Sequence, residues 1–210
     1  MRLVFVSLLI IMCPSISAQK DTEARIILDA FSEPALSAPA VSMKFKLTVE
    51  DKVEQATQES EGEVVIHDNM YKLELPDNII WFDGNATWTL APEVKEVTVT
   101  LPDPDDNTFL TSPSSLFDMY REGFKYRLTG ESQEGYAIDL YPEDPSDTDF
   151  SIIKLVIDRQ HRLVSAEYKR KDGINLFVEI TEYSLDKEYA PDYFTFDPDA
   201  NPGVDIIDMR

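Results

Sequence analysis

The chain has 210 residues, of which 40 are acidic and 19 basic, and its formal net charge is −21. This charge excludes a nucleic-acid-binding protein that works by neutralising phosphates, and it disfavours attachment to an anionic membrane surface. The sole cysteine, Cys13, lies near the N-terminus, so a fold stapled by internal disulfides is excluded as well.

The N-terminus has the layout of a secretory signal peptide. A positively charged start precedes an apolar run over residues 3–12, and small residues follow up to Ala18. The run is too short to span a membrane, so we expect residues 1–18 to be cleaved and residues 19–210 to form one exported domain. The residue before Cys13 is not small, which disfavours a lipid-anchored cysteine. We expect no stable membrane insertion, because no later segment has roughly 20 apolar residues.

A helix is predicted over residues 21–31, ahead of all the predicted strands. Pro34 and Pro39 then indicate a break in regular structure. The apolar side chains of this helix recur at helical spacing on one face: Ala24, Ile27, Leu28 and Phe31.

From Ser42 onward apolar residues recur at every second position, which is typical of strands with one solvent-exposed face. Asp83 and Gly84 lie between two such runs and predict a type I′ hairpin turn. Hairpin-length spacing favours antiparallel pairing throughout. The predicted strands are residues 42–50, 64–66, 71–75, 79–82, 86–90, 96–101, 124–128, 136–140, 153–157, 163–168 and 174–180.

Two acidic, proline-containing loops interrupt the strands, at residues 102–107 and 142–149. A short helix is predicted after the first loop, with Ser112 as its N-cap and Pro113 at its first position. We therefore predict a mainly β (α+β) fold: an incomplete antiparallel β-barrel of about 11 strands with a helical lid.

Catalysis has little support in the sequence. The histidines, His67 and His161, both lie in predicted turns, and no G-x-S-x-G motif frames a serine. Residues 103–107 and 197–201 have clustered oxygen ligands, but both lack the glycine and glutamate positions of an EF-hand loop. No glycine-rich phosphate loop is present. We expect no enzyme activity, no metal and no cofactor.

The apolar stripes of the strands allow two interpretations. They form an ordinary core if the interior is filled by protein. However, a curled sheet of this width, with only two predicted helices to cover it, favours an unfilled apolar hollow. A hydrocarbon ligand would fill that hollow and gain about 0.8 kcal/mol for each buried CH₂ group.

Several segments, in this order and spacing, resemble the periplasmic outer-membrane lipoprotein carrier (LolA) family. They look most like the branch found in Bacteroidetes-type bacteria, and the resemblance covers nearly all of the exported chain. The segments are residues 68–75 (DNMYKLEL), 83–90 (DGNATWTL), 92–99 (PEVKEVTV), 113–117 (PSSLF), 123–126 (GFKY) and 196–208.

This resemblance implies a soluble, monomeric periplasmic carrier. It implies that acyl chains of lipoproteins are received from an inner-membrane ABC transporter and handed toward the outer membrane, to an acceptor that the sequence does not identify. His67 is the nearest counterpart of a basic residue that helps release cargo in the family. The resemblance places these residues against the acyl chains: Ile27, Leu28, Phe31, Phe45, Leu47, Tyr71, Leu73, Trp88, Val97, Val99, Leu116, Phe117 and Tyr120.

Two other functions remain open at the level of sequence. A related half-barrel would serve as a periplasmic sensor of lipid or stray lipoprotein, signalling through a partner. An exported hydrolase would need a nucleophile beside a base in the folded cleft.

Overall fold

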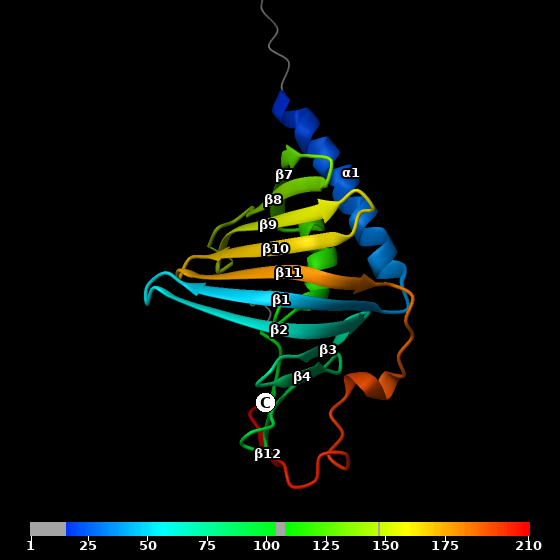
Figure 1. Cartoon of the computed structure of the whole chain (residues 1–210), viewed down its shortest axis with the longest axis vertical. Coiled ribbons are helices and arrows are strands. Elements are labelled where there is room, and N and C mark those ends of the chain that lie inside the picture. The colour runs from blue at the N-terminus through cyan, green and yellow to red at the C-terminus, as the bar shows by residue number, and fades with distance from the viewer. Residues whose placement is uncertain (1–15, 104–107, 147) are drawn as a thin grey trace, which may run out of the picture.

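The computed structural model describes residues 16–103, 108–146 and 148–210. Within them the chain forms one open 12-stranded sheet and one α-helix, so the predicted mainly β architecture is confirmed (Figure 1). The strand order is β12-β6-β5-β4-β3-β2-β1-β11-β10-β9-β8-β7. The strands are β1 Val41–Asp51, β2 Ala56–His67, β3 Met70–Glu74, β4 Ile79–Phe82, β5 Thr87–Ala91, β6 Glu96–Thr100, β7 Phe124–Glu131, β8 Gly135–Pro142, β9 Phe150–Asp158, β10 Leu163–Arg170, β11 Ile174–Ser184 and β12 Asp205–Asp208.

Two antiparallel meanders make up the sheet, β1 to β6 and β7 to β11, and β1 joins them by pairing with β11. The C-terminal strand β12 departs from the predicted antiparallel pattern, because it pairs parallel with β6, with Asp205 opposite Glu96. After β11 the chain runs past the ends of β2, β3 and β4 before it reaches this edge (Figure 1). It therefore arrives at β6 from a long connection rather than from a hairpin.

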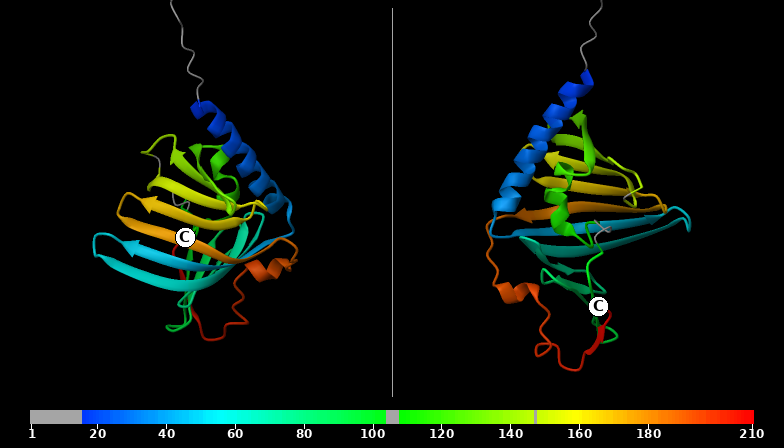
Figure 2. Two further views of the ribbon diagram at one scale, coloured as in Figure 1. Left: turned by 45° about the horizontal axis from the view of Figure 1, so that its top comes forward. Right: turned by 180° about the vertical axis from the view of Figure 1, so that it is seen from behind.

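The alternation in β1 defines two faces of the sheet. Met43, Phe45 and Leu47 are buried on what we call the inner face, whereas Lys44 and Lys46 are exposed on the outer face. The helix α1 (Ile16–Ser37) and two 3₁₀ turns, η1 (Pro113–Phe117) and η2 (Met119–Arg121), lie across the inner face (Figure 2). The core lies between these segments and the sheet.

The helix α1 is longer than predicted, and Pro34 lies inside it instead of ending it. A proline in the last turn removes one backbone hydrogen bond. The final turn persists because Ala35, just after the proline, is buried in the core. Packing therefore outweighs the local preference, and the break falls after Ser37.

The helix predicted after Ser112 forms as η1 and η2 rather than as a continuous α-helix. Ser112 precedes η1, but its side chain makes no capping hydrogen bond there. Asp118 lies between the two turns with φ −129° and ψ −15°, which interrupts helical geometry. Leu116 and Phe117 of η1 are nevertheless buried.

The predicted type I′ turn between β4 and β5 is wrong. Gly84 has a positive φ of 92°, but Asp83 is not among the described residues with positive φ. Instead, the Asp83 carboxylate accepts backbone N–H hydrogen bonds from Asn85 (2.8 Å) and Ala86 (2.9 Å). The side chain thus organises a four-residue turn, as aspartates do when they bond to the backbone two residues on.

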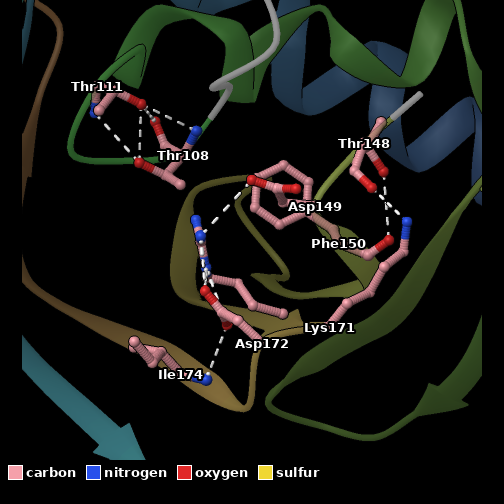
Figure 3. Close-up of polar contacts among 9 residues, drawn as sticks. Thr108, Thr111, Thr148, Asp149, Phe150, Lys171, Asp172 and Ile174 are labelled. Carbon is pink, nitrogen blue, oxygen red and sulfur yellow. Dashed lines mark hydrogen bonds and ion pairs between the residues drawn. The ribbon is translucent and has the colours of Figure 1, made fainter. Parts of the chain in front are cut away.

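The hairpin between β10 and β11 is held by charge-assisted contacts (Figure 3). The Arg170 guanidinium donates to the Asp172 carboxylate (Nη2 to Oδ2, 2.8 Å), and the Ile174 N–H donates to Asp172 Oδ1 (2.9 Å). The hydrogen bond from Arg170 and that from Ile174 lower the pKa of Asp172. The Lys171 ammonium donates to the carbonyl of Thr148, which ties this hairpin to the loop before β9.

Candidate functional site

A groove of about 460 Å³ lies on the inner face at the short strands β3 to β6. Its floor comes from these strands, and its far wall comes from the segment that leads into η1. This volume lies within the roughly 300–1,000 Å³ of typical small-molecule sites. The lining residues are Asn69, Tyr71, Ile80, Phe82, Thr87, Thr89, Thr100, Leu101, Pro102, Asp103, Leu110, Thr111, Ser112 and Ser114.

The floor is divided by strand into two chemically different halves. On β4, Ile80 and Phe82 point into the groove and are half-buried. Directly across the pairing, Thr89 on β5 lies opposite Ile80, and Thr87 lies opposite Phe82. Thr100 on β6 then lies opposite Thr87. The apolar half of the floor is therefore over β4, and its hydroxyl half is over β5 and β6.

A hydrogen bond joins the far wall to the floor. The Tyr71 hydroxyl on β3 donates to the carbonyl oxygen of Thr111 across 2.8 Å. Thr111 is part of a tight turn, in which the hydroxyls of Thr108 and Thr111 lie 2.8 Å apart (Figure 3). The Ser112 N–H donates to the Thr108 carbonyl in the same turn. This turn starts the segment 108–121, which we call the covering segment.

The other end of the covering segment is tied to α1. The Tyr120 hydroxyl donates to Asp29 Oδ1 (2.6 Å), and Arg121 Nη2 donates to the buried hydroxyl of Ser32 (3.2 Å). Burial, followed by the hydrogen bond to Asp29, raises the pKa of Tyr120. Tyr120 therefore stays neutral and remains a donor across the physiological range.

Between these two ties the covering segment fills the interior beside the groove. Phe109 meets Phe45 of β1 edge-on, with ring centroids 5.0 Å apart, and Phe117 packs on Phe31 of α1 at 5.3 Å. Gly62 on β2 allows this arrangement, because a Cβ there would lie 2.5 Å from Phe45 Cζ. The centre of the domain beside the groove is therefore closed by protein side chains.

The predicted acyl-chain residues fall into three groups. Tyr71 is the member of the set that lines the groove within the described part of the chain. Trp88, Val97 and Val99 share the outer face, since Trp88 pairs with Val99, and Val97 packs in a cluster with Trp88 and Phe196. The third group is buried in the main core: Ile27, Leu28, Phe31, Phe45, Leu47, Leu73, Leu116, Phe117 and Tyr120.

Trp88 lies on the face opposite Leu73. Its ring stacks on Phe196 of the C-terminal segment (5.5 Å, 15°), and its indole N–H donates to Asp83 Oδ2 (3.1 Å). Trp81, also on this face, meets Phe196 edge-on at 5.6 Å. The indole rings therefore form an outer cluster under the C-terminal segment rather than part of the groove.

Sequence reasoning missed most of the groove: Ile80, Phe82, the threonines of β5 and β6, and Leu110. One signal for them exists in the sequence. Thr87 and Thr89 alternate with Trp88 along the strand, so the two threonines must lie on the face opposite the tryptophan. However, the sequence does not show which of the two faces the C-terminal segment covers and which faces the groove.

His67 is not a turn residue; it ends β2 on the outer side of the sheet. Its Nδ1–H donates to the Pro39 carbonyl (2.6 Å), and its ring stacks on Phe194 at 5.7 Å. The ring is thus held by the C-terminal segment and does not line the groove. His161 is in the predicted turn, with φ 56°, and stacks on Tyr136.

The electrostatic character of the groove is simple. Among the described residues that line it there is no lysine, arginine or histidine, and the one ionisable group besides the Tyr71 phenol is Asp103 at the exposed rim. With a net charge of −21, the surrounding protein adds negative potential. Within residues 16–103, 108–146 and 148–210, no helix is both long and apolar enough to cross a membrane.

No protein-family model and no curated protein matches the sequence. The structure is similar to an uncharacterized conserved protein from Thermus thermophilus, with 13% identity, a TM-score of 0.54, and coverage of 89% of this chain and 99% of that one. It is also similar to a domain described as an outer membrane lipoprotein-sorting protein from Vibrio parahaemolyticus, with 7% identity, a TM-score of 0.50, and coverage of 83% and 97%. A LolA superfamily protein from Nitrosomonas europaea aligns with a lower TM-score of 0.45 and 13% identity. The alignment covers 87% of this chain and 99% of that one. At these identities the likeness concerns architecture alone, and this chain shares the fold of the Thermus thermophilus and Vibrio parahaemolyticus structures.

Proposed function

We propose that this protein is a periplasmic carrier, not an enzyme, that binds the acyl chains of lipoproteins. In this proposal it receives them from an inner-membrane ABC transporter and carries them toward the outer membrane as a monomer. Support comes from the fold, from the signal-like N-terminus and from a groove that is open on the inner face.

The observation that carries the proposal is a groove whose apolar side chains are only half-buried. Ile80 and Phe82 of β4 and Leu110 of the covering segment line it and keep part of their surface accessible. Such surface is removed from water when a hydrocarbon chain fills the groove, with a gain of about 0.8 kcal/mol for each CH₂ group. Reactive groups arranged as a nucleophile beside a base do not line the groove within the described residues.

The interior beside the groove is filled by the covering segment, so acyl chains too large for the groove can enter it only if that segment moves. Its ties to the sheet and to α1 include the hydrogen bonds from Tyr71 to Thr111 and from Tyr120 to Asp29. Breaking them costs about 1 kcal/mol each. Withdrawal of Phe109 and Phe117 would uncover Phe45, Leu47 and Leu73 on the inner face, and in this open state these residues would contact the acyl chains.

The test is a binding titration with the mature chain, residues 19–210. The probe is a fluorescent peptide of neutral sequence that carries two palmitoyl chains, because a basic peptide would bind to the acidic surface regardless of its lipid. The matched control is the same peptide without acyl chains. We expect saturable binding of the acylated peptide alone.

A variant pair places the binding in the groove. Thr89→Trp fills the groove from β5, whereas Thr57→Trp adds the same ring on the outer, exposed side of β2. We expect Thr89→Trp to weaken binding at least about tenfold and Thr57→Trp to leave it unchanged. Equal binding of acylated and plain peptides, or equal binding by the two variants, overturns the proposal.

A further inference from the structure

The hydroxyl half of the groove indicates what part of an amphiphile it receives. We propose that the groove selects an uncharged, oxygen-rich head group, an acylglycerol ester or hydroxyl, and rejects anionic heads. The acyl chain lies over Ile80 and Phe82, and the head meets Thr87, Thr89 and Thr100. This inference deepens the proposed function and rests on it.

The hydroxyls of Thr87, Thr89 and Thr100 are available to a ligand. None of them makes a side-chain hydrogen bond within the described residues, although all three are half-buried in the groove. A polar group that is removed from water without a partner is costly. A bound ligand that offers oxygens at these positions removes that cost, and a pure hydrocarbon does not.

Threonine hydroxyls both donate and accept hydrogen bonds. They therefore match ester carbonyls, which accept, and glycerol hydroxyls, which do both. The division by strand gives the ligand a direction, because the apolar side chains are on β4 and the hydroxyls on β5 and β6. An amphiphile that lies across the strands places its acyl chain on the apolar side chains of β4 and its head group on the hydroxyls of β5 and β6. If it were turned around, its acyl chain would lie on the hydroxyls and its head group on the apolar side chains.

The charge of the groove lining disfavours ligands with an anionic head group. A phosphate or carboxylate head is normally met by the cationic side chain of lysine or arginine. The described lining has no cationic side chain, and Asp103 at the rim adds a negative one. Exclusion of anions would separate lipid-modified cysteine, with its glyceryl esters, from the anionic lipids of the surrounding membranes.

The experiment uses two ligands that differ in one group, 1-dodecanoylglycerol and 1-dodecanoylglycerol 3-phosphate. Each displaces the neutral dye N-phenyl-1-naphthylamine from the mature chain at physiological ionic strength, below its micelle concentration. We expect the neutral lipid to displace the dye at a concentration at least about tenfold lower. Equal potency, or a preference for the phosphate, overturns the inference.

Two variants test the residues themselves. Replacing Thr87, Thr89 and Thr100 together by valine keeps the β-branched shape and removes the hydroxyls; we expect the affinity for dodecanoylglycerol to fall about tenfold while dye binding is kept. Thr89→Lys introduces a cation and should shift the preference toward the phosphate. The control Thr57→Val, on the outer face of β2, should change neither affinity.

The outcomes separate this inference from the proposed function. If neither lipid displaces the dye and the acylated peptide does not bind, the carrier function fails. If both lipids bind with equal affinity, or the valine variant retains full affinity for dodecanoylglycerol, the carrier function stands and the head-group selection is wrong.

Discussion

The Tyr71 hydroxyl on β3 donates a 2.8 Å hydrogen bond to the carbonyl oxygen of Thr111. This contact joins the floor of the groove to the covering segment, and Tyr71 itself lines the groove. The same hydrogen bond therefore fixes the far wall and limits how far it can move away from the sheet.

Removing this bond should loosen the covering segment. We expect Tyr71→Phe to lower the free energy of unfolding by about 1 kcal/mol and to speed the association of an acyl probe, as measured by denaturant titration and stopped-flow fluorescence. The matched control is Tyr141→Phe, whose hydroxyl bonds to Asp139 on the surface of β8. An unchanged association rate in Tyr71→Phe would show that the covering segment does not gate the groove.

The close approach of Phe45 to β2 requires glycine at position 62. A Cβ there would lie 2.5 Å from Phe45 Cζ and 2.8 Å from the Glu74 carbonyl oxygen, and backbone at that distance cannot easily give way. We expect Gly62→Ala to destabilise the fold by about 1–3 kcal/mol, the usual cost of overpacking.

Gly130→Ala is the control for this substitution, since its new methyl group would lie 3.4 Å from Ala137 Cβ. Thermal and denaturant unfolding of both variants provide the measurement. Equal stabilities in the two would mean that Phe45 and the covering segment do not pack as described.

The aromatic cluster on the outer face should be independent of ligand binding. Phe196→Ala removes the ring that covers Trp81 and Trp88, so we expect a red shift of tryptophan emission and a loss of about 3 kcal/mol of stability. Acyl binding by the folded variant should be unchanged. Phe177→Ala, at an exposed position on the outer face of β11, is the control and should cost little.

Acid should weaken the hairpin between β10 and β11. The hydrogen bonds from Arg170 and Ile174 lower the folded-state pKa of Asp172 below its unfolded value, which is about 3.9. The carboxylate therefore stabilises the fold above about pH 4, and that stabilisation is lost as the pH falls through the folded pKa.

We expect Asp172→Asn to show a smaller decrease in stability than the unmodified chain between pH 5 and pH 3, measured by denaturant unfolding. Because Arg170 and Asp172 are partly exposed, added salt should reduce the difference. A steeper decrease in the variant would contradict the assigned role of Asp172.

Strand β1 could be predicted because one of its faces is exposed to solvent. Along β1, Met43, Phe45 and Leu47 alternate with lysines, and this pattern fixes both the strand and its inner face. The end of α1 could not be predicted from Pro34, because the burial of Ala35 outweighs the missing hydrogen bond. The pairing of β12 was not visible either, since its side chains are exposed and its partner is over a hundred residues earlier.

The candidate site was harder to predict than the fold, and the reason lies in strands β3 to β6. The run Ile79 to Phe82 is apolar on both faces, because the C-terminal segment covers one face and the groove lies on the other. A period of two cannot tell these faces apart. Trp88, the largest side chain of β5, therefore suggested a cavity wall, whereas its neighbours Thr87 and Thr89 line the groove.

The carrier account is tested most directly by the position of a bound acyl chain. Photo-crosslinking of the mature chain with an acylglycerol that carries a diazirine in its chain, followed by peptide mass spectrometry, gives that position. The account predicts saturable labelling at Ile80, Phe82 and Leu110, and loss of that labelling in Thr89→Trp. Labelling confined to the outer face around Trp88 or Phe177, or labelling that does not saturate, would contradict it.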